Sequence, residues 1–215
     1  MDYKAIAEQV GPRVGATQEW IFHVLREGII SGKLPGGMQL KQDEISAALN
    51  VSHIPVREAL RRLEAQGLVR IHANRGAAVT ELARSELLVM MEVRATLSVM
   101  MMRTDFDALD EIVRQQRETS VEDIVHSEEL NYKFHEILTS HAKNSMANFL
   151  LELVHANIDR YLRASFYGTP QTREVSINEH EAIIMTCREG DFDSACNLLR
   201  DHILNAKQFI PNTMK

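Results

Sequence analysis

The sequence of 215 residues contains few of the residues that interrupt helices, with only 10 glycines and 5 prolines. Aromatic residues are also scarce, at 6% of the chain. All-β folds need turn residues between many short strands and aromatic or β-branched side chains within them. The composition therefore favours a mainly α-helical protein over an all-β fold.

Cysteines and long apolar runs are scarce or missing as well. Cys187 and Cys196 are the only cysteines, and they form neither a CxxC pair nor a disulfide framework of the secreted kind. No run of 18 apolar residues occurs, and acidic Asp2 and Glu8 stand where a signal peptide would be basic and then apolar. We expect a cytoplasmic protein with no membrane partner.

The net charge is −6, but the two signs are unevenly distributed. Residues 1–80 contain 10 Lys and Arg against 8 Asp and Glu, whereas residues 81–215 contain 14 against 22. Between residues 51 and 80 alone, five arginines stand against two glutamates. This pattern is typical of a small basic domain that binds nucleic acid, attached to an acidic body.

The first third of the chain has the pattern of a helix-turn-helix. Residues 1–16 contain glycines, a proline and no sustained apolar periodicity, so we expect a flexible N-terminal arm. Apolar residues then recur at helical spacing over about 18–31, and again in a short stretch that stops at Asn50. A further helix follows Ser52, a favourable N-cap, and ends near Gly67. Two short helices joined by a three-residue turn form a helix-turn-helix.

A β-hairpin is predicted directly after these helices. Two β-prone segments, 68–72 and 77–80, flank the tripeptide Asn-Arg-Gly at 74–76, and Asn and Gly tolerate the positive φ of a hairpin tip. The hairpin is the expected wing of a winged helix-turn-helix domain, which we place at residues 17–80.

Beyond residue 80 the pattern is helical throughout, without the alternation typical of exposed strands. Helices are predicted at about 84–103, 105–119, 127–141, 145–166, 173–189 and 192–209. The predicted fold is mainly α: an N-terminal winged helix-turn-helix followed by an all-helical bundle of about six helices over residues 81–215.

The segment from Val51 to Val69, VSHIPVREALRRLEAQGLV, resembles the winged-helix core of GntR-family transcriptional regulators. Asn74 to Val79 resembles the wing of the same family, so the resemblance covers most of residues 17–80. It implies a regulator that binds double-stranded DNA. Since one such domain covers few base pairs, we expect a homodimer on a palindromic operator.

The residues expected to contact DNA are His53, Ile54, Arg57, Arg61, Arg62, Arg75 and Gly76. The first three would meet base edges in the major groove, and Arg57 is the best candidate for pairing with guanine. The next two arginines would reach phosphates, and the last two residues belong to the wing. Many relatives carry arginine at the position of His53, and some carry arginine at the position of Asp43, so two cationic contacts are missing here. A simpler alternative is that Arg57 and Arg61 pair with glutamates of their own helix, Glu58 and Glu64.

Three of the nine histidines lie on different predicted helices beside apolar residues that should face the bundle core: His135, His180 and His202. Asn131 lies one helical turn before His135, on the same face. Three imidazoles and one amide oxygen that converge would form a metal site with an open position. The spacing alone leaves open that these histidines are surface residues or hydrogen-bonded core residues.

The stretches around these histidines resemble the FCD ligand-binding domain of the FadR-type branch of the GntR family, above all Glu179-His180 and residues 188–195. In metal-binding members, histidines match all three positions and an acidic residue stands where this chain has Asn131. The resemblance implies a divalent metal, zinc or nickel, held by Asn131, His135, His180 and His202. A neutral amide binds a cation less strongly than a carboxylate does.

Residues 92–97, EVRATL, resemble the first helix of that domain, where an arginine faces the cavity. An arginine beside a metal cation requires an anion between them, which implies a small carboxylate effector at Arg94. The alternative is that Arg94 pairs with Glu92 or with an acidic residue of the other domain.

We therefore expect a ligand-responsive repressor and no enzyme. A metal-dependent hydrolase fused to a DNA-binding head and a pure metal sensor are the alternatives. Glu136, Glu179 and Glu181 lie beside the histidines but form no recognisable catalytic motif, and the chain has no P-loop, nucleophile elbow or dinucleotide fingerprint. The part beyond residue 80 is too short for the aminotransferase-like domain that other GntR-type regulators carry.

Overall fold

The computed structural model describes residues 2–72, 76–81, 83–102, 105–120, 122–139, 145–166 and 170–210. The chain divides into two compact units, Met1–Leu82 and Ala83–Lys215. No helix among these residues is both long and apolar enough to cross a membrane.

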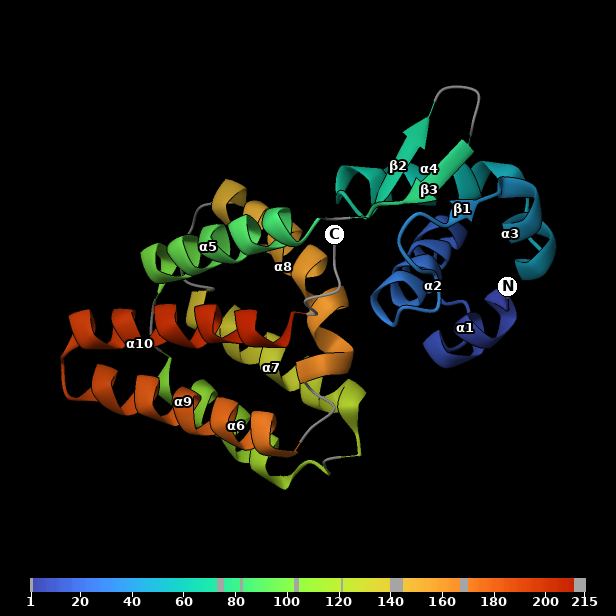
Figure 1. Cartoon of the computed structure of the whole chain (residues 1–215). Helices are drawn as coiled ribbons and strands as arrows, with labels where there is room; N and C mark the ends of the chain where they lie inside the picture. The colour runs from blue at the N-terminus through green and yellow to red at the C-terminus, as the bar shows by residue number, and fades with distance from the viewer. Residues whose placement is uncertain are drawn as a thin grey trace. The chain divides into compact units, whose positions relative to one another are not determined.

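The N-terminal unit combines four helices with a small sheet (Figure 1). Its elements are α1 (Tyr3–Val10), α2 (Thr17–Ile30), β1 (Gln39–Leu40), α3 (Gln42–Leu49), α4 (His53–Ala65), β2 (Val69–His72) and β3 (Gly76–Val79). Helix α2 packs against α4, and α3 packs against α4 across the turn of the helix-turn-helix. That turn starts at Asn50, whose φ of 51° is left-handed and whose N–H donates to the carbonyl of Ser46. Asparagine adopts this conformation more readily than most residues, which is why the helix ends there.

The expected flexible arm is wrong over most of its length. Residues Tyr3–Val10 form α1, whose N-cap Asp2 accepts a hydrogen bond from the N–H of Ala5 at 3.0 Å. Tyr3 and Ile6 are buried in the core of the N-terminal unit. A helix of two turns buries only these two residues, one turn apart, so its sequence shows too little periodicity to be distinguished from a coil.

The wing is a three-stranded antiparallel sheet in the order β1-β3-β2. Val69 pairs with Val79 and His72 pairs with Gly76, as expected for a hairpin. The third strand, β1, is two residues long and pairs Gln39 with Ala78. Such a short strand exists only because β3 supplies its hydrogen-bonding partner, and the sequence did not indicate it.

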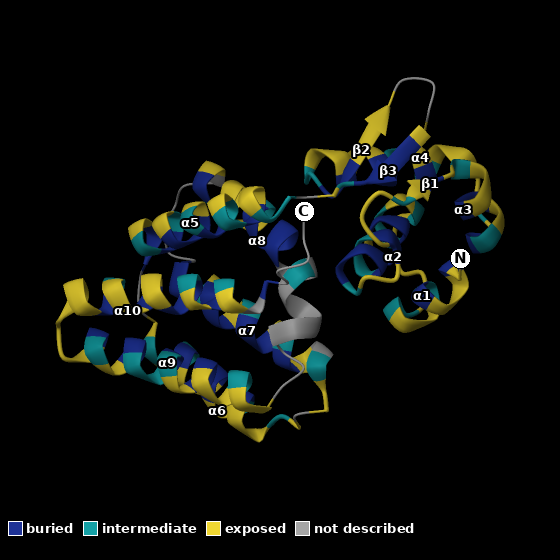
Figure 2. Cartoon of the chain, viewed as in Figure 1, coloured by how far each residue is buried: buried dark blue, intermediate teal, exposed yellow. Residues whose placement is uncertain are grey.

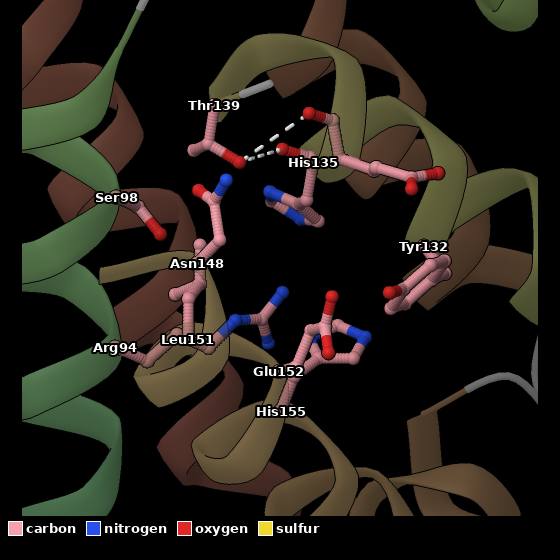
Figure 3. A pocket seen from close by; sticks show the side chains of 10 residues that line it. Arg94, Ser98, Tyr132, His135, Thr139, Asn148, Leu151, Glu152 and His155 are labelled. Carbon is pink, nitrogen blue, oxygen red and sulfur yellow. Dashed lines mark hydrogen bonds between the residues drawn. The ribbon is translucent and has the colours of Figure 1, made fainter. Parts of the chain in front are cut away.

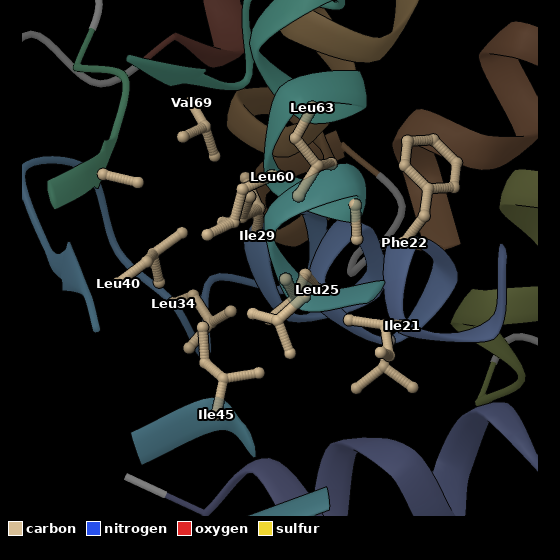
Figure 4. Packing of buried hydrophobic residues seen from close by; sticks show 14 of the residues in the cluster. Ile21, Phe22, Leu25, Ile29, Leu34, Leu40, Ile45, Leu60, Leu63 and Val69 are labelled. Carbon is tan, nitrogen blue, oxygen red and sulfur yellow. The ribbon is translucent and has the colours of Figure 1, made fainter. Parts of the chain in front are cut away.

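The core of the N-terminal unit is almost entirely aliphatic (Figure 4). Ile21, Leu25 and Ile29 project from one face of α2 toward Leu60 and Leu63 of α4. This packing fixes α4 to the body of the unit along one face and leaves its opposite face in solvent.

The C-terminal unit is helical throughout its described part, which confirms the mainly helical fold. Its elements are α5 (Arg84–Met101), α6 (Phe106–Glu118), α7 (Ile124–Thr139), α8 (Ser145–Phe166), α9 (Pro170–Arg188), α10 (Phe192–Asn205) and the 3₁₀ turn η1 (Ala206–Phe209). Helix α10 packs against α9 and α5, α5 against α8, and α6 against α7 and α9. Gly190, with φ of 83°, and the N-cap Asp191 make the tight turn between α9 and α10.

Candidate functional site

Helix α4 has one buried and one exposed face. Val56, Leu60 and Leu63 are buried, whereas the side chains of Ile54 and Arg57 are exposed, Ile54 by 65%. The predicted base contacts Ile54 and Arg57 therefore lie on the solvent-accessible face of the helix.

The exposed arginines of α4 form only weak pairs within the helix. Nε of Arg57 lies 3.6 Å and Nη1 of Arg61 lies 3.4 Å from the same carboxylate oxygen of Glu58. Exposed pairs of this kind contribute roughly 0–1 kcal/mol, so DNA can displace them. Glu64 is not part of this arrangement, because its carboxylate accepts a hydrogen bond from the N–H of Ile71 in the wing at 2.8 Å.

The remaining predicted DNA contacts differ in their surroundings. Arg62 pairs with Glu19 and stacks over the ring of Phe22, 4.0 Å from its centroid, which ties α4 to α2. Nδ1 of His53 lies 3.3 Å from a carboxylate oxygen of Asp43.

At the wing, Gly76 starts β3 with φ of 79°, a conformation that favours glycine, and no atom lies within 4 Å of where a Cβ would be. Arg75 lies outside the described residues.

The C-terminal unit brings three buried histidines together from α7, α9 and α10. Nε2 of His202 lies 3.2 Å from Nε2 of His180 and 3.3 Å from Nε2 of His135. All three possible ligand atoms lie within 4.8 Å of one another. Two nitrogens bound to one tetrahedral zinc ion at about 2.0–2.1 Å are separated by roughly 3.3 Å, so the spacing fits a metal ion.

Two of these rings are oriented by oxygen acceptors on their outer side. Nδ1 of His180 lies 3.0 Å from Oε1 of Gln116, and Nδ1 of His202 lies 2.7 Å from Oε2 of Glu179. An amide oxygen and an ionised carboxylate oxygen only accept hydrogen bonds, so in both pairs the Nδ1–H of the histidine is the donor. In the neutral rings both Nε2 atoms then carry lone pairs that face each other. Two lone pairs at this distance repel unless a metal cation or a shared proton lies between them.

Burial determines the charge of the cluster. It lowers the pKa of His135 well below the ordinary range, with a further contribution from the positive charge of Arg94. Burial also lowers the pKa of His180, followed by the effects of His202 and Arg94. For Glu179, burial alone would raise the pKa, but the hydrogen bond and charge of His202 outweigh it and hold the pKa below its usual value. His135 and His180 are therefore neutral, as metal ligands must be.

A cavity of about 260 Å³ lies beside the cluster and shares His135 with it (Figure 3). It is lined by Arg94, Ser98, Tyr132, His135, Glu136, Thr139, Asn148, Leu151, Glu152 and His155. Arg94 on α5 is 95% buried, and its guanidinium points into the cavity. Glu92 pairs with Arg200 and Lys207, so the predicted alternative of an Arg94–Glu92 pair is not formed.

Each of the two units matches a different family model. Residues 17–79 match the model of bacterial regulatory proteins of the gntR family, and residues 83–205 match the FCD domain. The chain belongs to the GntR family and carries an FCD domain. Its two parts thus agree with the family resemblance of the sequence.

Relatives of this GntR regulator share about a quarter of its residues. The HTH-type transcriptional repressor RspR of Escherichia coli is 26% identical over 211 residues, which cover 92% of this chain and 90% of the relative. The HTH-type transcriptional regulator YdhC of Bacillus subtilis is 25% identical over 193 residues, 85% of this chain and 84% of the relative. A GntR transcriptional regulator from Rhodococcus sp. RHA1 has the same fold, with a TM-score of 0.70, 23% identity and coverage of 92% of this chain and 99% of that structure.

The sequence and the FCD structure agree on part of the site. His135, His180 and His202 come together, and Arg94 lines the adjoining cavity. Asn131 is buried on α7, four residues before His135.

Sequence reasoning missed the FCD residues that surround the histidines. The sequence placed Glu179 beside His180 without assigning it a role, whereas in the structure its carboxylate orients the ring of His202. Its position beside His180 was the only signal available. Gln116 on α6 and the cavity residues His155 and Glu152 on α8 have no local pattern that distinguishes them.

Proposed function

We propose that this GntR-family regulator is a homodimeric repressor that binds a palindromic operator and responds to a small carboxylate through a metal-containing FCD domain. A protein with this role would act in the cytoplasm. The observation that carries the proposal is the convergence of three histidine Nε2 atoms at 3.2 and 3.3 Å, two of them on rings oriented by Gln116 and Glu179.

The residues that would hold the metal are His135, His180 and His202, with the amide oxygen of Asn131 as a further ligand. Zinc or nickel suits a set of imidazoles. Such a set carries no negative charge, so the protein ligands do not neutralise the double positive charge of the ion. A bound anion would therefore have to balance it. The bound metal would supply that charge as a Lewis acid at the edge of the cavity.

A small carboxylate fits the other side of the cavity. The guanidinium of Arg94 can bind a carboxylate with two hydrogen bonds. Nδ1 of His135 is buried and has no hydrogen-bond partner, while the corresponding atoms of His180 and His202 do have one. An acceptor on the ligand is one way to satisfy this donor. The cavity volume, about 260 Å³, suits a ligand smaller than a typical drug, whose pockets span roughly 300–1,000 Å³.

Dimerisation would use the FCD domain. Val89, Val93 and Met100 lie along α5 at helical spacing and expose 62%, 42% and 63% of their surface. An apolar stripe of this kind is typical of an interface. A ligand would change DNA affinity if it favoured one arrangement of the dimer over another. Repression is supported by the relative RspR, which is named a repressor.

The test starts from full-length protein stripped of metal by a chelator and a DNA site selected by the protein from random sequence. Zinc or nickel is added first, then acetate, lactate or citrate, while DNA affinity is followed by fluorescence anisotropy. We expect a carboxylate to change DNA affinity only in the metal-loaded protein, and His180→Ala to abolish both metal binding and this response. His23→Ala, an exposed histidine outside the cluster, is the matched control.

The outcomes distinguish the alternatives. Negligible metal content after reconstitution would remove the metal from the proposal, and a response to metal without any carboxylate would indicate a metal sensor. Asn131→Asp should tighten metal binding and reduce the contribution of the anion, because a carboxylate then supplies the missing negative charge.

A further inference from the structure

Two carboxylates line the cavity without any partner among the described residues. Glu136 on α7 and Glu152 on α8 are exposed, and neither side chain forms an ion pair or a hydrogen bond with a described residue. Other exposed glutamates of the same unit do form pairs: Glu111 and Glu118 both pair with Arg114. The two cavity carboxylates are therefore available to a ligand.

The buried part of the same cavity is positive or neutral. Arg94 is 95% buried, and His135, which is 94% buried, has an unpartnered Nδ1. In Figure 3 the guanidinium of Arg94 and the carboxylate of Glu152 both point into the cavity, from α5 and α8. The buried end of the cavity is thus cationic, and its exposed end is anionic.

A ligand that carries only a carboxylate does not match this distribution. Its acid group would be attracted to Arg94. The rest of the molecule would lie beside the carboxylates of Glu136 and Glu152 without a positive charge to pair with them. Charged groups gain free energy when each meets an opposite charge, and they lose it when like charges are brought together in a pocket.

We infer that the effector is a zwitterion, an amino acid in the broad sense, whose carboxylate binds at Arg94 and the histidine cluster and whose ammonium group binds at Glu152. This inference rests on the proposed function and specifies its ligand. Tyr132 supports the assignment, since its half-buried ring lines the cavity, 4.8 Å from the ring of His155, and an aromatic face attracts an ammonium group.

The experiment compares acids of one skeleton that differ in a single group. Two series are titrated into zinc-loaded full-length protein by calorimetry: alanine, lactate and propionate, and 4-aminobutyrate, 4-hydroxybutyrate and butyrate. The two series place the second group at different distances from the carboxylate. We expect the amino member of at least one series to bind about tenfold more tightly than its hydroxyl and alkyl counterparts.

Glu152→Gln separates recognition of the amine from recognition of the acid. It should bring the three members of a series to within about twofold of one another, and it should raise the affinity for the alkyl acid, because a neutral amide no longer repels a carboxylate. Glu189→Gln, at the exposed end of α9 and outside the cavity, is the matched control and should keep the preference for the amine.

Equal affinities within both series of the wild type, a preference for the hydroxyl acid, or an amine preference that survives Glu152→Gln would overturn the inference while leaving a carboxylate effector in place. If none of the six compounds binds the zinc-loaded protein, the carboxylate effector of the proposed function is wrong, and the inference is overturned together with it.

Discussion

Both units of the chain have a buried interior (Figure 2), but the two interiors differ in how many polar side chains they contain. Among the described residues of the N-terminal unit, the only buried side chains with a polar atom are those of Ser46 and Tyr3. The C-terminal unit buries twelve: Arg94, Ser98, Gln116, Ser127, Asn131, His135, Thr139, His155, Asn157, Ser176, His180 and His202.

This difference in buried polar groups bears on how each unit is stabilised. Apolar residues stabilise a fold by their own burial, at about 25 cal/mol per Å². Buried polar groups instead cost free energy until each has a partner, and a metal or a ligand can be that partner. Helix α4 is therefore held mainly by apolar packing, whereas under the proposed function the stability of the FCD domain would depend on the metal and ligand that it binds.

The largest expected loss of stability comes from a substitution in the apolar core of the N-terminal unit. Leu60 is 1% exposed between α4 and α2, so Leu60→Ala should lower the free energy of unfolding of this unit by about 3 kcal/mol through lost burial and a cavity. Urea denaturation followed by circular dichroism measures it, with the more exposed Leu198→Ala of α10 as the control. If the FCD domain is destabilised to the same extent, the two units do not unfold independently and the comparison fails.

The second effect concerns the FCD domain alone. Zinc at about 100 times its dissociation constant should stabilise the domain by about 2.7 kcal/mol, because only the folded state brings the three histidines together. Thermal unfolding with and without a chelator measures the shift, and His180→Ala should remove it. Zinc stabilisation that persists in His180→Ala would show that the ion binds elsewhere.

The third effect concerns the surface that the N-terminal unit presents. Arg57→Ala should cost about 1–3 kcal/mol of specific DNA binding and relax the base preference, because the exposed face of α4 would lose its guanine contact. Anisotropy with the selected site and with random DNA separates the two effects. Arg114→Ala, an exposed arginine of α6, should change neither. Equal losses on both DNAs would assign Arg57 to phosphate contact instead.

The smallest expected effect is a difference between the two units in how their stability depends on pH. In the metal-free FCD domain, His135 and His180 stay neutral because burial lowers their pKa, whereas in the unfolded chain each binds a proton below about pH 6.5. The unfolded state thus takes up more protons as the pH falls, so stability is lost on acidification, by about 0.7 kcal/mol for each histidine between pH 7 and pH 6.

The N-terminal unit supplies the control for this measurement. Its histidines, His23, His53 and His72, are all exposed. Urea titrations of each unit's transition at the two pH values should therefore show a smaller change for the N-terminal unit. An unchanged stability of the metal-free FCD domain would mean that these two rings are not held neutral.

Most of the fold could be predicted from the sequence because helices depend on short-range patterns. The spacing of apolar residues and single caps such as Asn50 and Asp191 determine where α3 ends and α10 begins. Elements that depend on a partner were not accessible: β1 exists only against β3, and α1 is too short to show a period.

The site divides in the same way. The residue types of His135, His180 and His202 and their places on helical faces could be predicted from the sequence, and the family resemblance suggested the metal-binding role that we propose for them. Only the tertiary structure brought together Gln116 with His180, 64 positions apart, and His135 with His202, 67 positions apart. Helical periodicity links residues within a turn or two, whereas these contacts depend on how whole helices pack. The sequence by itself therefore determined which helices form and which residues they offer, and helix packing decided which of those residues meet.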